Sequence, residues 1–129
     1  MNSTAADNKE FVIEYLRSLS GQVKTAELVA RFVSDPALAE HIRQAEAAFP
    51  RYELQVDGII AEGDLVSLRG TFRGVQRGTF ANIPATGREV AAGLMIFYRL
   101  EGRRIVEHWM QFDAAGLIAQ LTEARAVRA

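Results

Sequence analysis

The sequence predicts one α+β domain in which helices come first and an antiparallel sheet follows. Three observations predict it. Apolar residues recur at helical spacing up to Pro50 and mostly alternate after it. The chain has 129 residues, enough for one domain and too few for two ordinary ones. No repeat, low-complexity tract or linker divides it, so residues 1–129 are expected to form a single domain.

The first helix is predicted over residues 7–19. Asp7 is placed to act as its N-cap, with Glu10 three residues later as a capping-box partner, and Gly21 ends it. Its apolar stripe consists of Phe11, Val12, Tyr15, Leu16 and Leu19.

Two further helices are predicted before the strands. One covers about 25–33, and the other starts at Ser34 with Pro36 in its first turn, where a missing N–H costs nothing. Pro50 ends the third helix. Its buried face is predicted to hold Leu38, Ile42, Ala45 and Phe49.

After Pro50 the sequence predicts two antiparallel hairpins and a last helix. A turn at 62–64 separates the first two strands, a glycine-containing loop covers 74–87, and Glu101-Gly102 forms the second turn. The strands are predicted at 52–57, 66–73, 88–100 and 105–113, and the final helix at 114–126.

The final hairpin, 94–98 against 105–112, is apolar on both faces. One face can pack on the helices, so the sheet is expected to curl around them. The other must line a cavity or meet a second subunit. We therefore expect a homodimer.

Composition excludes several classes of function. The net charge of −1 gives no general attraction to nucleic acid or an anionic membrane. No cysteine is present, which excludes disulfides, thiol catalysis and Cys-ligated metals. His41 and His108 are too few and too far apart in the sequence to indicate a metal site.

The chain has no apolar run of the ~18 residues that a membrane span needs. Residues 1–10 lack the apolar core of a secretory signal. We therefore expect a cytoplasmic protein that does not contact a membrane.

Three segments resemble one known family. They are Ala48–Tyr52 with Ile60–Asp64, Gly74–Phe80 running into Ile83–Arg88, and Ile105–Asp113 with Gly116-Leu117 and Gln120-Leu121 beyond it. The chain resembles, over nearly its whole length, the SnoaL-like polyketide cyclases or ester cyclases of the NTF2-like superfamily.

The resemblance implies a fold and a chemistry. The fold is a cone in which N-terminal helices and a strongly curved antiparallel sheet enclose an apolar pocket, often as a homodimer through the sheet. The family's cyclases close a ring by intramolecular aldol condensation without a metal or other cofactor. An Asp after the tryptophan of the last strand acts as their acid/base, and that position is Asp113.

Three positions depart from the family pattern. Gln76 stands where members often have histidine, Arg51 where Asp follows Phe-Pro, and Thr122 where Gly follows Gln-Leu. The first departure removes a titrating partner that would assist Asp113. Because the superfamily's scaffold also hosts isomerases, dehydratases, hydrolases and plain binding domains, fold alone does not fix the reaction.

Asp113 has two interpretations. Desolvation in an apolar pocket would raise its pKa and let it act as both base and acid. Alternatively it caps the last helix, since Ala114-Ala115 follow it directly. A carboxylate turned to solvent would overturn the enzyme hypothesis.

The last strand separates its side chains into two sets. Alternation puts Glu107, Trp109, Gln111 and Asp113 on one face and His108 on the other with Met110. His108 is a second catalytic candidate, although a lone histidine in an apolar strand is more often a packed core or interface residue.

Other candidates would bind the substrate. Gln76 would donate to a substrate carbonyl, or be a solvated loop amide. Tyr15 would present its hydroxyl to the pocket, or simply pack in the core. Trp109, Met110 and Phe97 would contact an apolar ligand.

Four arginines lie in one third of the chain: Arg69, Arg73, Arg77 and Arg88. They could meet an anionic substrate tail, but Arg69 and Arg73 fit the solvated face of a strand better.

The sequence thus predicts a small cofactor-independent cyclase or isomerase-type enzyme acting on an apolar, polyketide-like carbonyl compound through Asp113. The alternative is a non-catalytic domain that binds a small apolar ligand or serves assembly.

Overall fold

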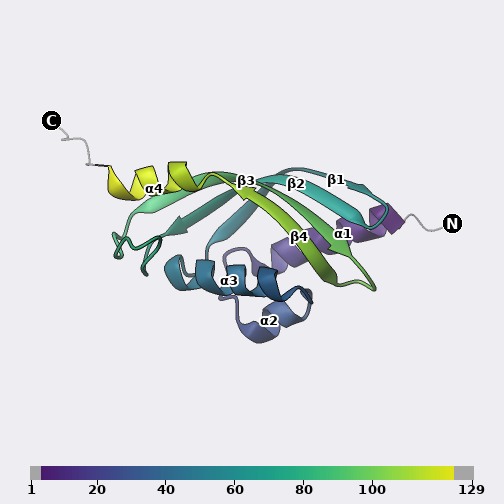
Figure 1. Cartoon of the computed structure of the whole chain (residues 1–129). Coiled ribbons are helices and arrows are strands. Elements are labelled where there is room, and N and C mark those ends of the chain that lie inside the picture. Colours follow the sequence, from purple (N-terminus) through teal and green to yellow (C-terminus); the bar gives the residue numbers. More distant parts are fainter. Residues whose placement is uncertain (1–3, 124–129) are drawn as a thin grey trace.

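The computed structural model describes residues 4–123 and confirms an α+β fold. The four strands form one antiparallel sheet in the order β1-β2-β3-β4. Figure 1 shows this sheet as a layer above α2 and α3, with α4 at one end. The elements are α1 Thr4–Leu19, α2 Ala26–Ala30, α3 Pro36–Ala48, β1 Glu53–Glu62, β2 Leu65–Val75, β3 Glu89–Leu100, β4 Ile105–Phe112 and α4 Ala114–Thr122.

Helix α1 carries the predicted apolar stripe but begins earlier than predicted. All five stripe residues are buried. Asp7 lies within the first turn and does not precede it, so its prediction as N-cap is wrong. Gly21 adopts a positive φ of 74° after the helix, and its N–H donates to the Tyr52 carbonyl at 3.0 Å. This contact joins the end of α1 to the start of β1.

Helix α2 is shorter than predicted because the chain after it pairs with a strand. Val33 forms a parallel bridge with Ile105, and the Ser34 N–H donates to the Ile105 carbonyl at 2.8 Å. The Arg104 guanidinium donates to the carbonyls of Ala30 and Val33, which the short helix leaves free. The bridge brings the start of α3 beside β4.

Helix α3 begins at Pro36, two residues later than predicted, with Asp35 as its N-cap. The Asp35 carboxylate accepts from the Ala37 N–H at 2.9 Å and from the Leu38 N–H at 3.4 Å. Pro36 occupies the first turn, as predicted. The helix stops at Ala48, and Phe49 is its buried C-cap.

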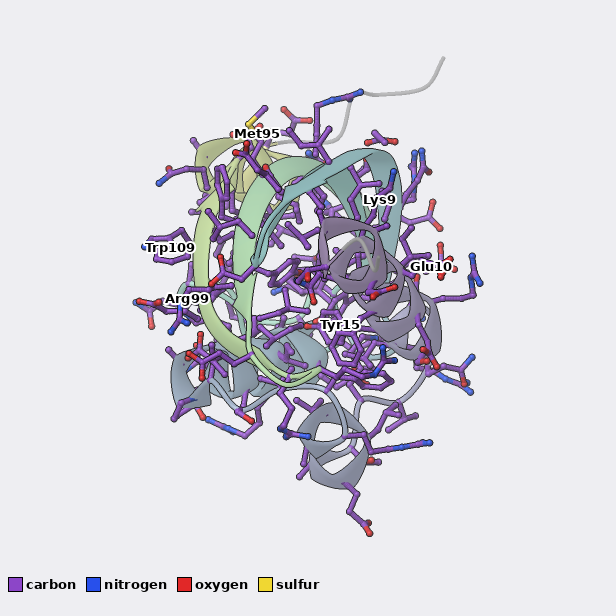
Figure 2. All side chains as sticks on the ribbon, turned by 90° about the vertical axis from the view of Figure 1, so that its right-hand side faces the viewer. Lys9, Glu10, Tyr15, Met95, Arg99 and Trp109 are labelled. Atoms are coloured by element: carbon purple, nitrogen blue, oxygen red, sulfur yellow. The ribbon has the colours of Figure 1, made fainter. Side chains whose placement is uncertain are left out.

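The sheet has one feature that alternation does not predict. Between β1 and β2, Val56 pairs with Gly70 and Gly58 pairs with Arg69, so Asp57 is an extra residue in a bulge. Its carboxylate accepts from the Thr71 hydroxyl at 2.7 Å. A bulge increases local twist, and the sheet curves strongly over the helices (Figure 2).

The two faces of the final hairpin differ in burial. On the inner face Leu94, Ile96 and Tyr98 are buried. On the outer face Met95 is 59% and Trp109 50% exposed, and Figure 2 shows both pointing away from the molecule. Helix α4 follows β4 up to Thr122, and the remainder of the predicted 114–126 helix beyond Glu123 lies outside the described residues. Within residues 4–123, no helix has the length and apolar character to cross a membrane.

Candidate functional site: an apolar cavity beneath the sheet

A cavity of about 580 Å³ lies between the inner face of the sheet and the helices. This volume suits a small organic molecule. Helices α1 and α3, all four strands and the loop at 79–81 contribute to its wall, and Leu117 of α4 closes one part of it. Most of the wall is apolar, including Leu38, Ile42, Ala45, Phe72, Leu94, Ile96, Met110 and Phe112.

Tyrosines supply polar atoms to this wall. Tyr15 points from α1 toward the space beneath the sheet (Figure 2) and packs against Tyr98. Their rings meet edge to face, with centroids 5.9 Å apart. Burial raises the pKa of both phenols above the ordinary value, and the Coulombic interaction with Tyr52 raises both further, whereas Tyr15 partly lowers the pKa of Tyr98. Both therefore stay neutral at physiological pH, so they remain hydrogen-bond donors.

Three titratable side chains form a connected chain beside the cavity. The His108 Nδ1 lies 2.7 Å from the Asp35 Oδ2, and the His108 Nε2 lies 3.4 Å from the His41 Nδ1. The two imidazole rings are perpendicular, with centroids 5.3 Å apart. The side chains of Asp35 and His108 are nearly buried, whereas His41 is exposed and lines the cavity. His41 therefore lies at the cavity mouth.

The Asp35 carboxylate serves two structures at once. One oxygen caps α3 and the other meets His108. Burial disfavours the charged form, but hydrogen bonds from His108 and from the Leu38 and Ala37 amides outweigh burial and hold the pKa of Asp35 below its ordinary value. Asp35 is thus an ionised hydrogen-bond acceptor at neutral pH.

The structure places only part of the predicted site in the cavity. Tyr15 and Met110 line it, and His108 lies on the inner face of β4 beside His41. Phe97 and Trp109 do not line it. They are cross-strand partners on the outer face of the sheet, where Phe97 is 48% exposed. The prediction that they contact a ligand inside the pocket is wrong, because the period of two puts them on the opposite face from Tyr98 and His108.

Asp113 does not face the cavity. It is exposed, and its carboxylate accepts from the Gly116 N–H at 2.9 Å as the N-cap of α4. The capping interpretation is therefore confirmed. The prediction of a desolvated base in the pocket is wrong, because the chain leaves the sheet at Phe112 and Asp113 already begins the helix.

Gln76 is completely buried, yet it is neither a substrate ligand nor a solvated amide. Its Nε2 donates to the carbonyls of Gly78 and Ile83, and its Oε1 accepts from the N–H and hydroxyl of Thr86. All the hydrogen-bonding capacity of the amide is used within the 74–87 loop, so nothing remains for a substrate carbonyl. Both predictions for Gln76 are corrected.

The arginines have separate roles. Arg88 donates to the Gln120 and Glu123 carbonyls at 2.9 and 2.8 Å, which satisfies the end of α4. Arg69 and Arg73 are exposed on β2, which confirms them as the solvated face of that strand. Arg73 and Arg77 also line a second pocket of about 680 Å³ outside the cavity, together with Arg51, Glu53 and Glu89.

Comparison with known proteins identifies the family. The model of the SnoaL-like polyketide cyclases matches residues 22–121. The chain belongs to the SnoaL-like polyketide cyclase family. No curated protein sequence gives a significant match to this SnoaL-like protein.

Solved structures share its fold at low sequence identity. AclR from Streptomyces galilaeus is 23% identical with a TM-score of 0.79, covering 98% of this chain and 87% of its own. A SnoaL-like protein from Jannaschia sp. CCS1 is 19% identical with a TM-score of 0.78, covering 97% and 98%. TsrD from Streptomyces laurentii is 24% identical with a TM-score of 0.76, covering 94% and 98%.

Sequence reasoning missed two residues of this SnoaL-like protein's site, Asp35 and His41. A signal for each was present. Asp35 precedes Pro36, a typical N-cap position, and His41 lies three residues after Leu38 and four before Ala45 on the predicted buried stripe. Their meeting with His108 depends on the pairing of Val33 with Ile105, which no local pattern indicates.

Proposed function

We propose that this SnoaL-like protein is a cofactor-independent cyclase or isomerase-type enzyme that acts on a small apolar, polyketide-like carbonyl compound. The observation that carries the proposal is the apolar cavity whose few polar groups can exchange or donate protons. The family supports a cyclase or isomerase-type role. Because Asp113 is exposed and caps α4, we assign the acid/base role to another group.

Aldol ring closure requires only proton movements around carbon–carbon bond formation. A base takes a proton from the carbon α to a carbonyl, and the resulting enolate attacks a second carbonyl of the same molecule. The new alkoxide then takes a proton, so no atom is gained or lost. Because these steps need only a base, an acid and an oxyanion donor, no cofactor has to take part.

We assign the base to His41. Histidine is the side-chain type that exchanges protons near neutral pH, and His41 is the only histidine among the described residues that line the cavity. The Tyr15–Tyr98 pair supplies the oxyanion donor. Both tyrosines line the cavity, and a neutral phenol O–H can donate to an enolate oxygen.

The second candidate is a binding domain without catalysis, which the exposed Asp113 favours. We also propose that the protein is a homodimer, because the outer face of β3 and β4 exposes Met95, Phe97 and Trp109.

The test uses 2-tetralone, an apolar ketone with exchangeable α-protons. Its binding is measured by calorimetry and the loss of its α-proton signals in D2O by NMR. We expect Ala45→Phe, which fills the cavity, to abolish both, and Ala37→Phe on an exposed site of α3 to preserve both. Binding without exchange above the buffer rate would favour the binding domain. If Ala45→Phe and Ala37→Phe bound the ketone and exchanged its α-protons equally well, the cavity would not be the site.

A further inference from the structure

We propose that Asp35, His108 and His41 form a proton relay that carries a substrate proton from the cavity to the nearly buried His108–Asp35 pair. This inference rests on the proposed function, since it assigns how the base of that site works. Asp35 and His108 do not touch the cavity, so they act through His41 as positioning and relay residues.

The hydrogen bonds determine the tautomer of both rings. An ionised Asp35 only accepts, so the His108 Nδ1 must carry the hydrogen that it donates over 2.7 Å. In the neutral ring the His108 Nε2 is then an acceptor, and the His41 Nδ1, 3.4 Å away, must be the donor. The other nitrogen of His41, Nε2, is left with its lone pair on the ring edge away from His108. This nitrogen is the base.

Proton transfer through the chain balances in two moves. The His41 Nε2 takes the α-proton of the substrate, and the His41 Nδ1–H passes its proton to the His108 Nε2. His41 ends neutral as the opposite tautomer, and His108 ends as an imidazolium that donates to Asp35. The returning proton follows the reverse path to the alkoxide, which restores both rings.

The surroundings favour storing the positive charge on His108. Asp35 gives the imidazolium a counter-charge at hydrogen-bond distance, and its position is fixed because its other oxygen caps α3. Glu40, beside His41 in the sequence, also stays ionised, because hydrogen bonds from Arg43 and Gln44 hold its pKa at about 2. Its carboxylate is exposed and paired with Arg43, so solvent screens its attraction for a charge on His41 more than it screens the attraction between Asp35 and His108. Tyr98, the cross-strand partner of His108, is neutral and adds no charge.

The first test reads the tautomers directly. Two-bond ¹H–¹⁵N correlation spectra of the neutral rings should show Nδ1–H for both histidines. In Asp35→Asn the side-chain oxygen must stay on the Ala37 amide, so the carboxamide N–H faces His108 and should switch it to Nε2–H. Asp113→Asn is the matched control, because it changes the other described N-cap aspartate, which has no histidine partner, and should leave both tautomers unchanged. An Nε2–H tautomer of His108 in the wild type would overturn the relay.

The second test measures α-proton exchange of 2-tetralone, with EDTA present so that no metal ion bridges the two imidazoles. We expect His41→Gln to lower the rate about 100-fold, the lower end of general-base effects. His108→Gln and Asp35→Asn should lower it at least about tenfold with ketone binding unchanged. If only His41→Gln lowered the exchange rate, and His108→Gln and Asp35→Asn kept it, the relay would be overturned and the proposed function would stand. If the wild type exchanged no α-protons, the proposed function would be overturned. The histidine tautomers measured in the first test would then still show whether the hydrogen-bonded chain of the relay exists.

Discussion

At the scale of single residues, the structure shows that buried polar side chains serve either the fold or the chemistry. Gln76 is committed to the fold, since its amide holds the 74–87 loop closed through four hydrogen bonds. Asp35 serves both, since it caps α3 and meets His108. The expectation that Gln76 donates to a substrate carbonyl is therefore wrong. The role that we propose for His108 follows from its contacts with Asp35 and His41, which its position in the sequence does not indicate.

Replacing Gln76 should destabilise the protein strongly. In Gln76→Ala the Gly78 carbonyl and the Thr86 amide lose their side-chain partner, the Ile83 carbonyl keeps only the Phe80 N–H, and a cavity replaces the buried amide. A polar group left unsatisfied when buried costs about 1–3 kcal/mol. Urea unfolding should show a loss of about 3 kcal/mol or more. Gln44→Ala, at an exposed glutamine of α3, should change stability by no more than about 0.5 kcal/mol. If Gln76→Ala and Gln44→Ala lost similar amounts of unfolding free energy, the Gln76 amide would not hold the 74–87 loop.

Asp35 should make stability depend on acid pH. Its folded-state pKa lies below the ordinary value of 3.8, so at pH values between the two the unfolded chain binds more protons. The stabilisation is complete above the ordinary pKa and is lost as the pH falls through the folded pKa. Urea unfolding from pH 6 downward should therefore show a shallower acid loss in Asp35→Asn than in the wild type. If the free energy of unfolding fell equally with pH in Asp35→Asn and in the wild type, the Asp35 carboxylate would not contribute to the pH dependence of stability.

Tyr98 should matter for catalysis more than for binding. Tyr98→Phe removes one phenol of the pair that we assign as oxyanion donor, so exchange of 2-tetralone should fall about 100-fold. Tyr52→Phe is the control, because Tyr52 also lines the cavity but lies outside the pair. A fall of equal size in both variants would show that the cavity's shape, and not a donated hydrogen bond, had changed.

At the scale of secondary-structure elements, local patterns predicted most of the fold. The stripe of α1, Pro36 in the first turn of α3, and the Glu101-Gly102 turn all follow from spacing and turn chemistry. The bulge at Asp57 and the bridge between Val33 and Ile105 do not, because both are set by pairing between distant segments. The candidate site was predicted less well for the same reason, since that bridge brings Asp35 to His108.

Helix α4 depends on its cap, which gives a direct test of Asp113. Asp113→Asn keeps a capping oxygen and should leave stability nearly unchanged, whereas Asp113→Ala should cost about 1 kcal/mol. Both variants should exchange 2-tetralone at the wild-type rate, because the carboxylate lies outside the cavity. A large rate loss in Asp113→Asn with normal stability would restore Asp113 as the acid/base.

At the scale of the whole molecule, the curved sheet divides apolar side chains between the cavity beneath it and an exposed outer face. The inner set binds the substrate in our account, and the outer set is left for a second copy of the chain. Phe97 and Trp109 are direct cross-strand partners and form the centre of that outer face. The two faces therefore predict two different partners.

The assembly prediction is a homodimer of about twice the 14.3 kDa of one chain, measured by light scattering at micromolar concentration. Phe97→Arg places a charge at the centre of the outer face and should give the mass of one chain. Ile60→Arg, at a 72% exposed position on β1, is the control and should keep the mass of the wild type. A wild type with the mass of a monomer would contradict the proposed dimer.

The central claim, that the cavity beneath the sheet is the functional site, is tested most directly by NMR of ¹³C-methyl-labelled methionine. Met110 lines the cavity and Met95 is exposed on the outer face, so the two methyl groups report on the two sides of one sheet. On titration with 2-tetralone we predict a saturable shift of the Met110 methyl signal and an unchanged Met95 signal. If only the Met95 signal shifted, or neither signal shifted at saturating ketone, the ketone would not bind in the cavity beneath the sheet.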